Sequence, residues 1–478
     1  MLLLLADIDT RTQSHMSRPI QISSTLSNKR TLKMETNVIA ETTFNTEAIS
    51  KTDTTVARVM QFGDLELAFT TEYEYRWNDR GSGADHDIGF YHPIPPAGFY
   101  ALGSIGVNNY DNPNGKFASL CVKNVSKPNQ KPALAQPIRF DLIWTDRGSG
   151  AKADGSCWRP VPPAGYVALG DIFVTGYNAP TGRQVMCVAE ELVCDGKIGN
   201  LIWDDTGSGA DRDFGVWQID ASQSFLDTPD GIFAVNSFVG RDSHQKPDSA
   251  SVAYNLRLPL PTEVVTHAID KPILTGRTKP PTHTNPKVDR IVTVPFTAVR
   301  DDTKNVEWRV RNSPFYTVER SVDYSLVLFI DNTTQTEQSA STSITTGVSK
   351  ESSQTFSINT GITVGYESGI DAGGFSTKAS VSLTIELGYS TTQSVTQFRS
   401  ETDEATLIAA PNHAAALWIE SNSLQVRRAD RSPVGAPLSF ETIDTGYVIS
   451  EYPADLRGTE NRSTVMLRRN RSRLPTLE

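Results

Sequence analysis

Two runs of alternating apolar and polar residues lie close together in the C-terminal half of the chain, at 356–366 and 379–389, with a glycine-rich stretch between them. Because successive side chains of a strand point to opposite faces, each run predicts a strand with one apolar and one polar face. Folding the runs about Ala372 and Gly373 brings apolar residues opposite one another and places Glu367 opposite Lys378. The pattern therefore predicts an amphipathic β-hairpin over residues 356–389.

The length of the first run suits a membrane as well as a sheet. Eleven extended residues span roughly 36 Å, which lets a tilted strand cross a hydrocarbon layer. Open sheet edges are not tolerated in lipid, so a membrane role would require several chains, each giving one hairpin. An ordinary hairpin, buried on one side in a Ser/Thr-rich β-sandwich, explains the same pattern.

The two faces of the predicted hairpin differ in chemistry. The apolar, lipid-facing candidates are Phe356, Ile358, Ile362, Val364, Tyr366, Ile370, Phe375, Ala379, Val381, Leu383, Ile385, Leu387 and Tyr389. The polar, lumen-facing candidates are Ser357, Asn359, Thr363, Glu367, Lys378, Ser380, Ser382, Thr384 and Glu386. Ile370 and Phe375 stand near the tip, so they are expected to touch lipid first.

A threefold repeat dominates the N-terminal half. WNDRGSGADHD begins at Trp77, WTDRGSGAKAD at Trp144 and WDDTGSGADRD at Trp203, and each is followed by a block of the type PPAGFYALG and then by an alternating strand. Three equivalent β-units of about 60 residues predict a closed domain with pseudo-threefold symmetry. A β-prism-like arrangement, with each tryptophan pointing inward, is the predicted form, and a β-trefoil is the alternative.

Two aspartates bracket the Gly-Ser-Gly turn of every copy. Their oxygens, beside free backbone N–H groups, are candidate ligands for sugar hydroxyls or for calcium. The alternative is structural, with aspartate capping the turn and glycine supplying positive φ. The sequence has no calcium loop of the DxDxDG type. The candidate ligand-binding residues are Asp79, Asp87, Asp146, Asp154, Asp205 and Asp213.

Helix signals are sparse, so the whole chain is predicted to be all-β. Composition shifts divide it into five parts. They are a polar N-terminal arm (1–55), the three-repeat domain (56–260), a Pro-rich linker (261–290), a strand-rich domain (291–456) and a basic tail (457–478).

Composition narrows the classes of function. A net charge of −10 argues against nucleic-acid binding, and no apolar run reaches the length of a transmembrane helix. The apolar start MLLLL is short for a signal sequence, so secretion or release by another route is expected. The four cysteines match neither a zinc nor a redox pattern, which favours buried free thiols. The histidines lie in no nucleophile or metal signature, so no catalytic residue, metal or cofactor is expected, and the protein is not expected to be an enzyme.

Two resemblances follow from these motifs. The repeated W-x-D-x-G-S-G-A and PPAG blocks over roughly 60–260 resemble the vacuolar protein sorting-associated protein 62 family. The long Ser/Thr-rich runs that flank the predicted hairpin, over about 291–455, resemble the aerolysin-like β-pore-forming proteins. This second resemblance implies an elongated β-sheet pore-forming domain behind a binding head.

The resemblances imply a function. It is that of a pore-forming toxin or defence protein, which binds the target-cell membrane through a surface glycan or other receptor. Homo-oligomers would then insert one hairpin per protomer into a transmembrane barrel. The alternative is a non-penetrating lectin or adhesin that binds carbohydrate without making pores.

Overall fold

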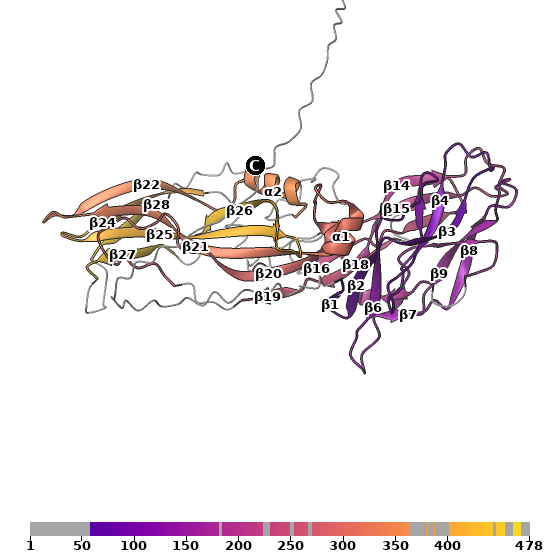
Figure 1. The fold of residues 1–478 in the computed structure, drawn as a ribbon, viewed down its shortest axis with the longest axis horizontal. Coiled ribbons are helices and arrows are strands. Elements are labelled where there is room, and N and C mark those ends of the chain that lie inside the picture. Colours follow the sequence, from indigo (N-terminus) through magenta and orange to yellow (C-terminus); the bar gives the residue numbers. More distant parts are fainter. Residues whose placement is uncertain are drawn as a thin grey trace, which may run out of the picture. The chain divides into compact units, whose positions relative to one another are not determined.

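The structure is a computed structural model, and it describes residues 58–180, 184–222, 230–248, 253–265, 270–362, 379–380, 387, 401–442, 446–454 and 462–469. Residues Thr55–Glu478 form one compact unit. The predicted arm at 1–55 lies outside the described residues. The described part is built almost entirely of strands, which confirms the prediction of an all-β protein (Figure 1).

Each repeat folds into a three-stranded antiparallel sheet, with the tryptophan of its motif on the first strand. A β-bulge immediately precedes each tryptophan, and the extra residue turns the indole toward the interior. The three sheets are β3 (Tyr73–Asn78), β4 (Gly89–Pro93) and β5 (Ile105–Val107); β8 (Arg139–Thr145), β9 (Gly155–Val161) and β11 (Ile172–Thr175); and β14 (Lys197–Asp204), β15 (Gly215–Asp220) and β17 (Phe238–Arg241).

The three tryptophans meet in one aromatic core. The ring centroids of Trp77 and Trp144 lie 5.8 Å apart, those of Trp77 and Trp203 6.2 Å, and those of Trp144 and Trp203 6.4 Å. All three side chains are buried and pack with the phenylalanines of the same sheets. The inward-pointing tryptophans confirm the predicted pseudo-threefold, prism-like arrangement.

Hydrogen bonds close the three repeats into a ring. The indole N–H of Trp77 donates to the carbonyl of Ala153 in the second repeat, that of Trp144 donates to Arg212 in the third, and that of Trp203 donates to His86 in the first. Backbone N–H groups of Lys152, Asp211 and Asp85 donate to carbonyls of Arg80, Arg147 and Thr206, in the opposite direction around the ring. Each Gly-Ser-Gly loop is therefore held by its neighbour in the ring.

A second group of small sheets contains the PPAG-type blocks and the last strand of each repeat. One position of the block pairs with that strand in every copy: Tyr100 with Val122, Val167 with Val188 and Phe233 with Leu256. The sheets are β1 (Met60–Phe62), β2 (Leu65–Thr70) and β6 (Ser119–Asn124); β7 (Leu134–Ala135), β12 (Cys187–Ala189) and β10 (Tyr166–Val167); and β13 (Val193–Asp195), β18 (Tyr254–Pro259), β16 (Asp230–Phe233) and β23 (Ala379–Ser380). A 3-10 turn, η1 (Glu190–Leu192), joins β12 to β13.

The four cysteines of the repeat domain are free thiols. Cys121, Cys157 and Cys187 are buried on strands, and Cys194 is half-buried. Burial raises the pKa of Cys121 and of Cys187 to about 12, so both thiols stay protonated and unreactive. The prediction of buried free thiols is confirmed for three of the four.

The C-terminal domain contains two facing sheets of long strands (Figure 1). β21 and β25 pair over most of their length, from Thr317 opposite Arg427 to Asp331 opposite Ala414. The larger sheet contains β19 (Thr262–Val264), β20 (Lys287–Pro295), β21 (Phe315–Asp331), β25 (Ala414–Arg427), β26 (Pro433–Thr442) and β27 (Val448–Tyr452), with η2 (Phe296–Ala298) and α1 (Val306–Asn312) between β20 and β21. The smaller sheet contains β22 (Gln338–Thr346), β24 (Glu401–Ala409) and β28 (Thr464–Arg469).

The apolar run AAALWI at 414–419 lies between two layers. Ala415, Leu417 and Ile419 face β22 and β24 of the smaller sheet, while Ala414, Ala416 and Trp418 pack on the other side with Leu274 and Tyr324. A strand covered on both faces needs apolar residues at every position, which explains the loss of alternation here.

Two predicted boundaries are wrong. The described residues of 261–290, a segment predicted to be a linker, lie along the larger sheet: the N–H groups of Thr284 and Leu326 donate to the carbonyls of Tyr324 and Thr282, and Leu274 is buried. In the predicted basic tail at 457–478, Thr464–Arg469 forms β28, which pairs with β24. Both segments satisfy their backbone groups by joining a sheet edge, which composition alone does not reveal.

One hydrophobic cluster, here called the shared core, draws on both domains. From the repeat domain it contains Phe62, Phe69 and Phe233, and from the C-terminal domain it contains Phe296 and Phe315. The rings of Phe69 and Phe296 are 4.7 Å apart, and those of Phe62 and Phe315 are 6.0 Å apart. The two domains of the unit Thr55–Glu478 therefore share buried apolar surface.

Candidate functional site

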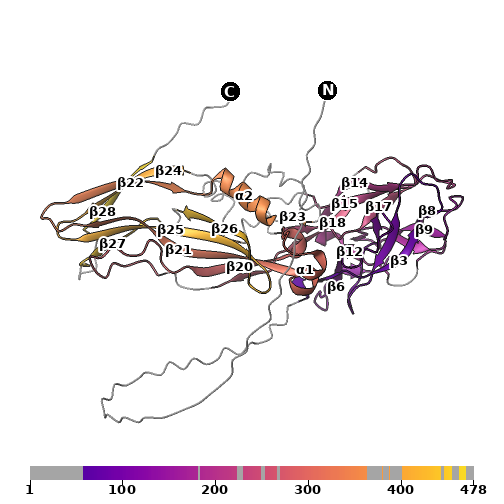
Figure 2. The same cartoon turned by 45° about the horizontal axis from the view of Figure 1, so that its top comes forward.

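The first run of the predicted hairpin begins as a helix. Residues Lys350–Thr360 form α2, which lies beside β26 (Figure 2). Ser349 caps its start by accepting a hydrogen bond from the N–H of Ser352, and Gly361 ends it with a φ of 75°. The prediction of a strand from residue 356 onward is wrong for 356–360, because these caps and the burial of one helix side outweigh the alternating pattern.

Helix geometry separates residues that a strand would align. Phe356 and Ile362 are buried in the shared core, whereas Ile358 is 40% exposed. Ser357 is buried, and Asn359 is exposed close to Gly435 of β26. The predicted apolar face is therefore divided between core and solvent in this structure.

Part of the second run is bound to the repeat domain. Ala379 pairs with Phe233 and Ser380 with Ile232, so β23 extends the sheet that contains β16. Leu387 is buried in the shared core. The hairpin residues outside the described part are Thr363, Val364, Tyr366, Glu367, Ile370, Phe375, Lys378, Val381, Ser382, Leu383, Thr384, Ile385, Glu386 and Tyr389.

The first aspartate of each Gly-Ser-Gly loop holds the loop together. Asp79, Asp146 and Asp205 are buried, with 3 to 4% of each residue exposed. Their Oδ1 atoms accept hydrogen bonds from the backbone N–H groups of Ile88, Gly155 and Phe214, at 3.0, 3.1 and 2.8 Å. The first glycine of each loop has a φ between 82° and 96°, which favours glycine. This geometry matches the structural alternative for these three residues.

The second aspartate of each loop is exposed and has a partner that sequence reasoning missed. Tyr110 hydrogen-bonds to Asp79 and Asp87, and Tyr177 to Asp146 and Asp154. In the third repeat His244 stands near Asp213, and its Nε2 lies 2.6 Å from Asp205 Oδ1. Comparison of Ser104–Tyr110 with Asp171–Tyr177 aligns the two tyrosines, but the third repeat has one extra residue before His244. Because of this extra residue, the sequence does not show that His244 stands in the place of Tyr110 and Tyr177.

The charges at these loops shift the pKa values of the aromatic partners. Burial and the hydrogen bonds to Asp87 and Asp79 raise the pKa of Tyr110. Partial burial lowers the pKa of His244, but the hydrogen bond to Asp205 and the negative charges of Asp205, Asp213 and Asp204 together outweigh this effect, so the pKa ends above its ordinary value. Arg80 and Arg147 stack on Tyr110 and Tyr177, with 4.2 and 4.3 Å between the guanidinium carbon and the ring centroid.

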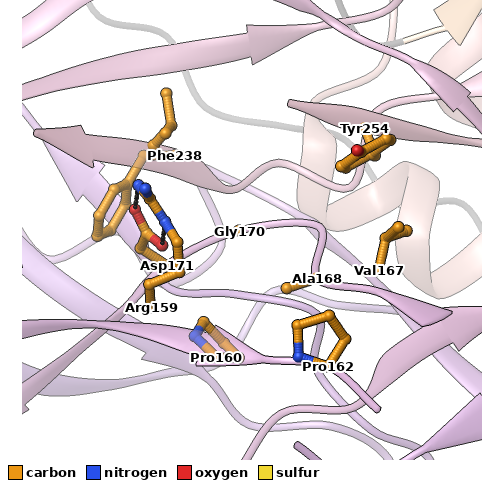
Figure 3. Close-up of a pocket in the computed structure, with 10 residues that line it drawn as sticks. Arg159, Pro160, Pro162, Val167, Ala168, Gly170, Asp171, Phe238 and Tyr254 are labelled. Carbon is orange, nitrogen blue, oxygen red and sulfur yellow. Dashed lines mark hydrogen bonds and ion pairs between the residues drawn. The ribbon is translucent and has the colours of Figure 1, made fainter. Parts of the chain in front are cut away.

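A cavity of about 200 Å³ lies between the second repeat and the third, which contributes Phe238, Val239 and Tyr254 (Figure 3). One side is formed by Arg159 and Asp171, and the other by Val167, Ala168 and Tyr254, with prolines along the wall. Arg159 donates from Nε and Nη2 to the two carboxylate oxygens of Asp171, at 2.9 and 2.8 Å. The carboxylate of Asp171 raises the pKa of Arg159 further above its ordinary value. Sequence reasoning gave no sign of this pair.

Across the described ranges, no group of three His, Cys, Asp or Glu side chains is arranged to hold a metal ion. Within the same ranges, every helix is too short or too polar to cross a membrane.

Fold and site define a two-domain all-β protein, with a threefold repeat domain and a domain of long strands. Residues 43–257 match the family model of vacuolar protein sorting-associated protein 62, and residues 290–444 match that of the insecticidal crystal toxin P42. No curated protein matches the chain.

Two solved structures are similar over part of the chain. GNIP1Aa from Chromobacterium piscinae is 26% identical with a TM-score of 0.33, over 40% of this chain and 37% of GNIP1Aa. Cry35Ab1 is 14% identical with a TM-score of 0.29, over 78% of this chain and 90% of Cry35Ab1. The chain thus spans little more than a third of the length of GNIP1Aa.

The resemblance of the repeats to the vacuolar protein sorting-associated protein 62 family is confirmed. The C-terminal domain matches an insecticidal toxin family. This match supports a toxin-type domain, but it is less specific than the expected resemblance to aerolysin-like pore-forming proteins.

Proposed function

We propose that this protein is a secreted or released pore-forming toxin of the aerolysin-like kind. The repeat domain binds a glycan or other receptor on a target cell, several copies assemble, and each copy inserts one hairpin from residues 356–389 into a transmembrane barrel. The toxin type of residues 290–444 supports the class. The main observation in support of a pore is the register of β22 and β24, the strands on either side of the predicted hairpin.

β22 and β24 form an uninterrupted antiparallel ladder. Gln338 lies opposite Ala409 and Thr346 opposite Glu401, and the two numbers of every pair add up to 747. Continued along the chain in an extended state, the same register reaches a two-residue turn at Gly373–Gly374. Two glycines are among the preferred residues of tight hairpin turns, because both central positions need positive φ. The sequence pattern by itself centred the turn one residue earlier, at Ala372–Gly373.

The alternation of inward-facing and outward-facing side chains on β22 and β24 also supports the continuation of their register into residues 356–389. Ile344 on β22 and Ala405 and Leu407 on β24 point inward against the larger sheet. Side chains alternate, so the inward face continues into even-numbered positions after β22 and odd-numbered positions before β24. These are the positions of Phe356, Ile358 and the other lipid-facing candidates.

The outward face of the ladder also matches. It carries hydroxyl pairs, with Ser341 Oγ 2.7 Å from Thr406 Oγ1 and Thr345 Oγ1 3.1 Å from Thr402 Oγ1. These outward positions are odd-numbered on β22 and even-numbered on β24. The same alternation, continued along the chain, includes Ser357, Thr363 and the other lumen-facing candidates. One alternation therefore runs through the observed ladder and the predicted hairpin.

Insertion of the hairpin requires α2 to unfold. The sequence of α2 makes the free energy of this unfolding small. Six of its eleven residues are Ser, Thr or Asn, which are poor helix formers in helix interiors. We propose that α2 is a storage form of the hairpin's first strand.

A pair of adjacent substitutions tests the proposal. Leu383→Lys places a charge on the proposed lipid face, at a cost of roughly 2–4 kcal/mol per hairpin near the bilayer centre. We expect it to abolish dye release from target-cell membrane vesicles while leaving binding intact. The matched control, Thr384→Lys, places the same charge on the proposed lumen face and should retain release. Equal effects of the two variants would reject the assigned faces.

Cross-linking tests the register. In assembled pores, the pair Val364→Cys and Leu383→Cys should oxidise to a disulfide, because these positions add up to 747. The pair Val364→Cys and Val381→Cys, which the sequence pattern alone places opposite one another, serves as the comparison. Preferential bonding of 364 to 381 would show that the hairpin is offset from the ladder.

The non-penetrating lectin or adhesin predicts a different outcome. It binds vesicles without releasing dye, and negative-stain images show no rings with central holes. That result would reject the pore and keep the binding role.

A further inference from the structure

On the side that the second repeat contributes to the cavity, a small residue stands where the other repeats have an aromatic one. Val167 pairs with Val188 as Tyr100 pairs with Val122 and Phe233 with Leu256. Phe233 is fully buried and Tyr100 half-buried, and both pack on the shared core. Valine at this position leaves space beside Ala168, Pro162 and Tyr254.

The polar end of the cavity is also particular to this repeat. Arg159 lies fifteen positions after Trp144, and the equivalent residues are His92 and Gln218. Its partner Asp171 is 2% exposed and corresponds to Ser104 and Ser237. Asp171 also accepts the N–H of Gly240 at 2.7 Å, and Arg159 Nη2 donates to the carbonyl of Gly240 at 2.7 Å. The backbone of Gly240 therefore holds both Arg159 and Asp171 in position.

One nitrogen of the Arg159 guanidinium, Nη1, keeps its two N–H groups available. This nitrogen makes no hydrogen bond within the described part of the chain, and the side chain of Arg159 is 34% exposed at the edge of the cavity (Figure 3). The neighbouring Arg–Asp pair has no net charge, and the whole chain carries −10. An anion therefore gains little here, whereas a neutral hydroxyl can accept from Nη1.

We propose that this cavity is a binding site for one neutral sugar ring. A pyranose has apolar C–H faces, which fit against Val167, Pro162 and Tyr254, and a rim of hydroxyl groups for Arg159. The cavity is smaller than the roughly 300–1,000 Å³ of sites for drug-sized ligands, as a single ring requires. The inference rests on the glycan-binding role proposed above and locates it between the second and third repeats, away from the Gly-Ser-Gly loops.

Ligand-observed saturation-transfer NMR with the full chain tests the site directly. The probes are glucose, galactose, mannose, N-acetylglucosamine and N-acetylgalactosamine, with glucuronic acid and N-acetylneuraminic acid as acidic comparators. At least one neutral sugar should receive saturation at millimolar concentration. Failure of every neutral sugar, or stronger binding of an acidic one, would overturn the inference.

A cavity-filling variant tests the location. Val167→Tyr introduces the residue of the first repeat at its equivalent position, so the fold is expected to accept it. It should weaken sugar binding by about tenfold or more, equivalent to about 1.4 kcal/mol. Ala97→Tyr adds the same side chain at an exposed position of the first repeat and should bind as the parent does.

Val167→Phe, the residue of the third repeat, provides a second filling variant should the tyrosine perturb folding. Unchanged binding in a folded filling variant would place the sugar elsewhere. Dye release from vesicles is measured in parallel. If the parent chain releases dye but binds no neutral sugar, this site alone is rejected, whereas a parent chain that releases no dye rejects the proposed pore.

Discussion

At the residue scale, the buried aspartates of the Gly-Ser-Gly loops show how a motif that suggests ligand binding serves the fold. Asp146 accepts from the N–H of Gly155 and from the indole N–H of Trp77, which belongs to the preceding repeat. Its two oxygens are thus used within the protein. Aspartate is needed there because a buried N–H without an acceptor costs free energy.

Removing one of these carboxylates should therefore reduce stability rather than binding. For Asp146→Ala we expect a loss of roughly 1–3 kcal/mol in the free energy of unfolding, because the buried N–H of Gly155 loses its acceptor and the indole N–H of Trp77 keeps only the carbonyl of Ala153. Urea denaturation measures it. Asp195→Ala, at an exposed strand end, should change stability by about 0.5 kcal/mol or less. An Asp146→Ala variant of parental stability that no longer binds sugar would restore the ligand role.

A second residue-scale prediction concerns His92, which is 5% exposed, with its Nδ1 3.0 Å from Ser104 Oγ and its Nε2 3.1 Å from the carbonyl of Gln184. Burial, with a smaller contribution from Arg76, lowers the pKa of His92 from 6.5 to about 4. The unfolded chain therefore binds a proton between pH 6.5 and about 4 that the folded chain does not. Stability should fall through this window as the pH falls, by on the order of 3 kcal/mol in total.

The measurement is the midpoint of urea unfolding between pH 7 and about 4. His92→Gln introduces the residue that the third repeat has at this position and should remove this part of the acid destabilisation. His86→Gln, at an exposed position of the same repeat, is the control and should leave the acid dependence in place. An identical pH dependence in His92→Gln and the parent would show that His92 is not the source.

At the scale of elements, α2 is stabilised mainly by contacts at its two ends. Arg300 supports its C-terminus, with the backbone N–H donating to the carbonyl of Thr360 at 2.8 Å and Nη1 donating to that of Ile358 at 3.0 Å. Ser349 and Gly361 supply the caps. The interior contributes little propensity, so the end contacts decide between helix and strand.

Gly361→Ala should therefore weaken α2. A Cβ at this position would lie 2.9 Å from the backbone N of Arg300, on a residue with a φ of 75°. We expect a loss of about 1 kcal/mol or more in stability, together with dye release at a lower protein concentration if α2 stores the first strand. Gly276→Ala is the control, because its Cβ would meet nothing within 4 Å. Destabilisation without any change in release would separate α2 from insertion.

At the scale of the molecule, the shared core couples the repeat domain to the C-terminal domain. Phe356, Ile362 and Leu387 of the predicted hairpin belong to it, beside residues of the repeats. A contiguous core unfolds cooperatively. Thermal unfolding measured by calorimetry should therefore show one transition for Thr55–Glu478.

Phe233→Ala tests this coupling. Phe233 is fully buried, lies 5.9 Å from Phe62 between ring centroids and pairs with Ala379. The substitution should lower the single transition as a whole, by roughly 3–5 kcal/mol. Two separate transitions, of which only one responds, would show that the domains unfold independently.

Much of the fold could be predicted from the sequence, because its cause is local and repeated. The Trp and Gly-Ser-Gly blocks recur at regular intervals, and three identical requirements for burial lead to one threefold core. The long Ser/Thr-rich runs that flank the predicted hairpin were likewise expected to be strands, and the described parts of them form β22 and β24. The exposed Asp87 and Asp154 were found as candidates, but their partners Tyr110 and Tyr177 were missed because they come from another part of each repeat.

What the sequence by itself determined is therefore the all-β class, the threefold repeat and the alternation of the predicted hairpin, since these depend on the period of side chains along one segment. Only the tertiary structure decided that 356–360 is helical, that 261–290 and Thr464–Arg469 join sheets, and that Val167 opens a cavity beside Arg159 and Asp171. The physical reason is that helix caps, sheet edges and cavities depend on which distant groups satisfy a hydrogen bond or fill a volume. Those partners are chosen by the packing of the whole chain.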